Sequence, residues 1–162
     1  MATDSMMGSQ TIAAQTQAWV KEVIMKYNIC PFARREVERD SIRYTVCEQS
    51  RMDTALQALL DECQYLDEHP QAETSLFILP RGFEGFHLYL DLLAFAEQLL
   101  FEEGYEGVYQ LASFHPDYCF EGEAQEDAAN YTNRAPYPTL HIIREASMEQ
   151  ALAEYDDPES IP

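Results

Sequence analysis

Apolar side chains recur along this chain at helical spacing in some segments and at strand spacing in others. Residues 12–27 carry them every three or four positions, which predicts an amphipathic helix. Residues 42–47 alternate apolar and polar, the pattern of a strand with one covered face. Helical spacing returns over residues 52–66, and the run SLFIL at 75–79 is typical of a central strand. The first half is therefore predicted as helix, strand, helix, strand.

The segment of residues 84–103 predicts a third helix, which ends at Gly104. Its apolar side chains lie on most sides of the helix rather than on one stripe. Such a helix is either deeply buried or packs against another chain. We therefore expect the monomer to bury it, or a homodimer to form through it. Two short apolar runs, near residues 107–112 and 139–144, predict the last two strands.

These elements predict an α/β fold, with α+β as the alternative, in a single domain over residues 1–162. Each strand–helix–strand unit favours a right-handed crossover, so the first three strands should run parallel. The fourth strand follows the third with no clear helix between them and should be antiparallel to it. The expected structure is a mixed four-stranded sheet flanked by helices, with flexible ends at residues 1–10 and 156–162.

Charge narrows the classes of partner. The chain has 10 Lys and Arg against 29 Asp and Glu, a net charge of −19. Nucleic-acid binding needs a basic surface, so the sequence predicts no nucleic-acid partner. The negative charge also disfavours binding to anionic membranes. No apolar run reaches the roughly 18 residues of a membrane span. Solubility accounts for the acidity, and the alternative is a docking surface for a basic partner.

The N-terminus lacks a basic region followed by an apolar run, so no signal peptide is predicted. The four cysteines are widely separated and form no CxxC pair. A chain of this length buries a sufficient core without disulfides. We therefore predict a reduced protein in the cytoplasm.

Polar side chains occur in loops that the predicted topology brings together. Ligands of open α/β sheets bind beyond the carboxyl ends of the parallel strands. The second and third strands both end before such a loop, and an antiparallel fourth strand begins at the same rim. The candidate catalytic residues of this rim are His115, Asp117 and Asn133, and the candidate substrate-binding residues are Arg134, Arg81, His141 and Tyr137.

The residue types suggest how such a site would work. An imidazole suits general acid–base chemistry near neutral pH, and Asp117 would orient the ring of His115. Arg134 offers a planar fork for a carboxylate or phosphate, and Asn133 offers an amide hydrogen bond. The alternatives are structural. His115 would hold a turn through a backbone bond, Arg134 would cap loop carbonyls, and His141 would be a satisfied residue of its strand.

Cys30 is a further candidate, because the two arginines that follow CPFA (30–33) would lower its pKa and favour a thiolate. CPFA resembles the CPxC motif of glutaredoxins without its second cysteine. YPTLHII (137–143) resembles the cis-proline strand of thioredoxin-like proteins. The segment after CPFA is too short for the long helix of that fold, which argues against this relationship.

Three longer motifs between residues 28 and 145 carry a more specific resemblance. They are NICPFAR (28–34), ASFHPDY (112–118) and TNRAPYPTLHIIRE (132–145). On these motifs the chain resembles an uncharacterised domain family of unknown function, found mainly in proteobacteria. The resemblance implies a bacterial protein and brings no established activity. His115, Asp117 and Cys119 could together form a metal site. Cys119 stands where a polar residue is expected in that family, which weakens this metal hypothesis.

Three hypotheses from different classes follow. The first is a small cytoplasmic enzyme acting on an anionic small molecule, with His115 as general acid/base and Arg134 binding the anion. The second is a non-catalytic binding or scaffold module that docks a partner on the third predicted helix. The third is a metal-binding protein that uses His115, Asp117 and His141 or Cys30. The sequence specifies no cofactor.

One structural observation separates the first two hypotheses. A concave pocket that holds the side chains of His115 and Arg134 favours the enzyme. Side chains locked inward, together with an exposed apolar patch, favour the binding module.

Overall fold

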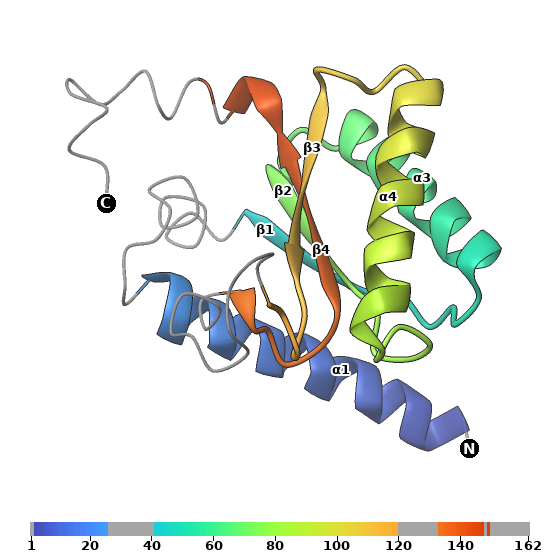
Figure 1. The fold of residues 1–162 in the computed structure, drawn as a ribbon. Helices are drawn as coiled ribbons and strands as arrows, with labels where there is room; N and C mark the ends of the chain where they lie inside the picture. Colours follow the sequence, from blue (N-terminus) through green and yellow to red (C-terminus); the bar gives the residue numbers. More distant parts are fainter. Residues whose placement is uncertain (1, 26–40, 120–132, 148, 150–162) are drawn as a thin grey trace.

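The computed structural model describes residues 2–25, 41–119, 133–147 and 149 (Figure 1). In chain order its elements are α1 (Ala2–Trp19), the π-helical segment η1 (Val20–Met25), β1 (Ile42–Val46), α3 (Met52–Glu68), β2 (Thr74–Ile78), α4 (Phe86–Glu102), β3 (Tyr109–Phe114) and β4 (Thr139–Arg144). A mixed α/β structure with one four-stranded sheet and flanking helices is confirmed.

The strand order differs from the prediction. The order across the sheet is β1-β2-β4-β3, so β4 lies between β2 and β3. β1 pairs with β2 in parallel, whereas β4 pairs antiparallel with both β2 and β3. The antiparallel pairing of β3 with β4 agrees with the prediction. The prediction that the first three strands form neighbouring parallel pairs is wrong, because only β1 and β2 pair in parallel.

The difference arises in the second crossover. The connection through α4 places β3 one position further from β2 than in a simple crossover, and β4 fills the gap. The sequence of β4 suits a central place, because Leu140 and Ile142 are both fully buried. β3 is less buried along its length. This lower burial agrees with the place of β3 at the edge of the sheet.

Helices cover the two faces of this sheet (Figure 1). α3 and α4 pack on one face, where their buried residues meet Phe77 and Leu140. α1 and η1 pack on the other face through Trp19 and Val20, which contact Leu76. Neighbouring residues of a strand point to opposite faces, which is why Leu76 and Phe77 belong to different apolar clusters.

The helix α4 is buried along one stripe only. Tyr89, Leu92, Ala96 and Leu100 form this stripe and face the core. Several large apolar side chains of the helix remain exposed to solvent: Leu88, Leu90, Phe95 and Phe101. One of the two expectations was that the monomer buries this helix on most sides, and the single chain does not do so. The other expectation, a homodimer through α4, stays a prediction.

Two arginines bind the sheet to α3. Arg43 donates from Nε to the buried carboxylate of Glu62 (2.7 Å), which also accepts hydrogen bonds from Thr45 and Ser75. Arg144 donates to backbone carbonyls at and beyond the C-terminal end of α3. Cations are favourable at this end of a helix, where the last carbonyls lack intrahelical partners. Both side chains therefore have structural partners.

Residues 2–10, expected as a flexible end, are helical because α1 already begins at Ala2. The other expected flexible end, residues 156–162, lies outside the described residues. Within the described ranges, no helix has both the length and the apolarity that crossing a membrane requires.

Candidate functional site

The topology brings the predicted rim together at one end of the sheet. In the strand register, Val46 pairs with Ile78, and Ile78 and Phe114 both pair with Thr139. The loops after β1, β2 and β3, and the loop before β4, therefore leave the sheet at the same end. Arg81, His115, Asn133 and Arg134 lie in these loops.

His115 is fully buried at this end, and both of its ring nitrogens bind the main chain. Nδ1 lies 3.0 Å from the backbone N–H of Asp117, which can only donate. Nδ1 is therefore the acceptor, so Nε2 carries the proton and donates to the Phe83 carbonyl at 2.9 Å. The neutral imidazole links the loop after β3 to the loop before α4. This arrangement favours a structural role, and its predicted catalytic role stays a prediction.

Two aromatic rings pack against this imidazole. The rings of Phe86 and Tyr89 lie 5.1 Å and 5.0 Å from it, centroid to centroid. The Tyr89 hydroxyl donates to the Thr139 carbonyl (2.6 Å) and accepts from the Phe114 N–H (3.0 Å). Burial raises the pKa of Tyr89 far above its ordinary value, so the hydroxyl remains a donor. It bridges β3 and β4 where the two strands separate.

Asn133 and Arg134 hold the two loops of the rim together. Asn133 donates from its side-chain amide to the Ser113 carbonyl (3.0 Å), and its own carbonyl accepts from the His115 N–H (3.0 Å). Arg134 donates from Nε to the Tyr118 carbonyl at 2.9 Å. Both side chains are partly buried and engaged with the backbone of the preceding loop. This Nε contact agrees with the structural alternative for Arg134, in which the side chain caps loop carbonyls.

Arg81 follows β2 and lies beside the loop after β1. Its Nη1 is 3.6 Å from Oε2 of Glu48, and the side chain is 55% exposed. The turn is held close by Gly82, whose φ is +91°. A Cβ at this position would approach the Ser50 carbonyl oxygen to 2.5 Å, so only glycine fits. Arg81 is thus directed toward an acidic partner within the chain.

Two further predicted rim residues, Asp117 and Tyr137, also lie in these loops. Asp117 is exposed, and its main chain rather than its carboxylate contacts His115. Tyr137 donates from its hydroxyl to Gln15, which ties the loop before β4 to α1. The predicted catalytic role of Asp117 and the predicted substrate-binding role of Tyr137 stay predictions.

His141 lies inside β4 on the face that α1 covers, opposite Leu76. Its Nε2 is 2.8 Å from Oγ1 of Thr74, and that hydroxyl donates to the Ile142 carbonyl at 2.5 Å. The threonine proton is thereby used, so Nε2 of His141 must be the donor and Nδ1 carries the lone pair. Burial lowers the pKa of His141 to about 4, which keeps the ring neutral near pH 7.

The thiol and metal hypotheses find little support in the described part of the chain. Cys30 lies outside the described residues. Cys47 and Cys63 are free and buried, and burial raises the pKa of Cys63 to about 12. Across residues 2–25, 41–119 and 133–147, no three His, Cys, Asp or Glu side chains are arranged to hold a metal ion.

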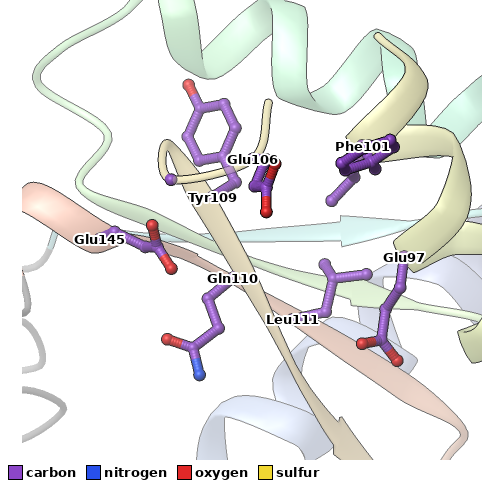
Figure 2. Close-up of a pocket in the computed structure, with 9 residues that line it drawn as sticks. Glu97, Phe101, Glu106, Tyr109, Gln110, Leu111 and Glu145 are labelled. Carbon is purple, nitrogen blue, oxygen red and sulfur yellow. The ribbon is translucent and has the colours of Figure 1, made fainter. Parts of the chain in front are cut away.

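A groove that sequence reasoning missed lies between α4 and the edge strand β3. Its volume is about 310 Å³ (Figure 2). Glu97 and Phe101 project from the helix toward Leu111 on the strand, while Glu106 and Glu145 add two further carboxylates. Phe101 is 58% exposed. We call this hollow the α4–β3 groove.

A second hollow lies on the other side of α4, against α3. It is lined by Met52, Leu56 and Phe95 together with the ion pair of Arg51 and Asp53. We call it the α3–α4 groove. At 100° per residue, Leu88 and Phe95 share this side of the helix, whereas Leu90 and Phe101 share the side toward β3.

The sequence contained one indication of an exposed apolar surface beside α4. The apolar excess of residues 84–103 indicated that α4 has more than one apolar side. The position of the α4–β3 groove could not be predicted, because it requires β3 at the edge of the sheet.

The chain belongs to the family described as protein of unknown function (DUF1415), whose model matches residues 11–162. This membership confirms the resemblance to an uncharacterised domain family. No curated protein and no solved structure matches the chain.

Proposed function

We propose that this domain is a non-catalytic binding module that docks a basic polypeptide on the exposed sides of α4. The observation that carries the proposal is the exposure of large apolar side chains of one helix, with Phe95 56% and Phe101 58% exposed. Exposed apolar side chains beside a hollow are typical of protein interaction surfaces. His115 and Arg134 are meanwhile held by the backbone, the arrangement expected for a binding module rather than an enzyme.

Charge favours a basic partner over a second copy of the chain. Each copy has a net charge of −19, so two copies facing each other through α4 would repel. The α4–β3 groove adds Glu97, Glu106 and Glu145 to this repulsion. A partner rich in Lys and Arg would gain from the same field, because complementary potentials raise the rate of association and exclude wrong partners.

A peptide-display selection with random twelve-residue sequences tests the proposal. We expect selected peptides enriched in Lys and Arg next to apolar residues, and we expect Phe95→Ser or Phe101→Ser to weaken their binding at least about tenfold. Both side chains are exposed, so neither change should unfold the domain. Fluorescence anisotropy measures the affinities, and Arg134→Ala serves as the matched control at the rim.

The proposal fails if the selected peptides bind both Phe variants as tightly as the unchanged domain. It also fails if Arg134→Ala removes binding, because the rim rather than α4 would then hold the peptide.

The second candidate is the enzyme acting on an anionic small molecule. It is supported by the convergence of Arg81, Asn133 and Arg134 at one end of the sheet. The fork of Arg134 would bind a carboxylate or phosphate if its terminal nitrogens face a ligand.

Isothermal titration calorimetry with phosphate- and carboxylate-bearing metabolites tests this candidate. If the enzyme hypothesis is right, Arg134→Ala should weaken anion binding by about 1.5–3 kcal/mol, the value of a charge-assisted hydrogen bond. Arg51→Ala removes an exposed arginine elsewhere and is the control. Equal binding by both variants would contradict an anion site at Arg134.

A further inference from the structure

We infer that the α4–β3 groove binds its partner as an added β-strand, an extended basic segment that pairs with the outer edge of β3. The inference rests on the proposed function and specifies the form of the partner. Strand addition to a free sheet edge combines main-chain hydrogen bonds, which supply affinity, with alternate side chains, which supply specificity.

The hydrogen-bond pattern shows which part of the edge is open. The N–H of Glu145 donates to the Val108 carbonyl (2.9 Å), so Val108 belongs to a hydrogen-bonded pair of β3 and β4. Such pairs alternate along an antiparallel ladder. Gln110 and Ala112 therefore also face β4, whereas the backbone groups of Leu111 point away from it.

Contacts within the chain limit this open edge at both ends. The N–H of Tyr109 donates to the Tyr105 carbonyl, and the carbonyl of Ser113 accepts from the Asn133 side chain. Between these two contacts lies a stretch centred on Leu111, whose outward backbone groups have no partner among the described residues. Among the described residues, β4 is the strand that pairs with β3, and no other strand lies along this outer edge. An edge of this kind is a template for another strand.

The groove surrounds this stretch. Leu111 lies on the α4 side of β3 and Gln110 on the opposite side, and both line the groove. A partner strand would therefore place one set of side chains against Leu111 and Phe101, and the alternate set toward Gln110 and Glu145. The first set should be apolar. The second should be basic, because Glu145 lies on its side of the strand.

A second copy of the chain does not fit this edge. Pairing of two β3 strands around Leu111 would bring two sets of Glu97, Glu106 and Glu145 together, which is unfavourable. The partner is therefore a different, basic segment of alternating apolar and cationic residues.

The peptide KVKLKVK, acetylated and amidated, is the probe, and fluorescence anisotropy with the full chain measures its binding. Two N-methylated forms provide the decisive comparison, one methylated on the even residues and one on the odd residues. In an added strand only alternate N–H groups face β3. We expect one form to lose at least about tenfold in affinity while the other stays within about threefold of the unmodified peptide.

Two charge-matched variants separate this groove from the general acidity of the protein. The triple change Glu97→Gln, Glu106→Gln and Glu145→Gln should weaken KVKLKVK binding at least about tenfold. The control removes three exposed carboxylates that do not line the groove, by Glu68→Gln, Glu84→Gln and Asp91→Asn. It has the same net charge and should bind within about threefold of the unchanged domain.

The inference is overturned if both methylated peptides bind equally, or if the two triple variants weaken binding equally. The proposed function would still stand in either case if the peptides selected by display lose affinity for the Phe95→Ser variant. The binding site would then be the α3–α4 groove. Loss of dependence on both Phe95 and Phe101 would remove the proposed function as well.

Discussion

Leu92→Asp should abolish the cooperative unfolding of this domain. Leu92 is 1% exposed and belongs to the core cluster of α4, α3 and the sheet. The change removes a buried apolar side chain, which contributes about 1.5–3 kcal/mol. It also places a carboxylate inside an apolar cluster, which adds a penalty of several kcal/mol. Domains of this size are stable by only about 5–15 kcal/mol, so the folded state should be largely lost.

Phe95→Asp is the matched control, since it adds the same charge to the same helix. Phe95 is 56% exposed in the single chain, and an exposed substitution of this kind changes stability by about 0.5 kcal/mol or less. Circular dichroism during thermal unfolding compares the two variants. A folded Leu92→Asp protein with an unchanged melting temperature would contradict the position of α4 in the core.

The same pair of variants tests the predicted homodimer. If α4 joins two copies, Phe95→Asp should convert a dimer to a monomer in analytical ultracentrifugation without unfolding it. If the unchanged chain already sediments as a monomer, the apolar sides of α4 remain available to a different partner, as the proposed function requires.

The strands could be located from the sequence because their patterns are local. The predicted strands near residues 42–47, 75–79 and 139–144 agree with β1, β2 and β4 to within one residue at each end. The third prediction, 107–112, begins two residues before β3. Gly107 has a φ of +80° and forms part of the turn after α4, so the strand cannot begin there.

The order of the strands could not be predicted, because it depends on contacts between distant segments. Local pattern does not specify whether β3 pairs with β2 or leaves space for β4. The rim could nevertheless be predicted, since the directions of the strands determine which loops share an end of the sheet. Those directions follow from the crossovers and from the antiparallel return of β4. Arg81 and His115 share an end in either strand order.

The chemistry of His115 could not be read from its neighbours in the sequence. A proton donor to Nδ1 comes from Asp117, two positions away, but the acceptor for Nε2 is the carbonyl of Phe83, on another loop. Only the folded chain shows that both nitrogens are engaged. For His141, the alternative of a satisfied strand residue agrees with the bond of one ring nitrogen to Thr74, whereas its predicted substrate-binding role stays a prediction.

His141 should make the stability of the domain depend on pH between about 6.5 and 4. Burial lowers the pKa of His141 from 6.5 to about 4 in the folded state. The unfolded chain therefore binds a proton at a higher pH than the folded chain does. The stabilisation by neutral His141 is fully present above pH 6.5 and is lost as the pH falls to about 4. This difference in pKa corresponds to about 3 kcal/mol, reduced to about 2 kcal/mol because the residue as a whole is only partly buried.

Urea unfolding of the unchanged domain and of His141→Gln at several pH values between 7 and 4 measures this effect. Carboxylates also titrate in this range, and 29 Asp and Glu are present, so the stability of either protein alone is not informative. The difference between the two proteins isolates His141. The free energy of unfolding should favour the unchanged domain most at pH 7, and its advantage should fall by about 2 kcal/mol by pH 4. Parallel curves for the two proteins would mean that burial does not hold the ring of His141 neutral in the folded domain.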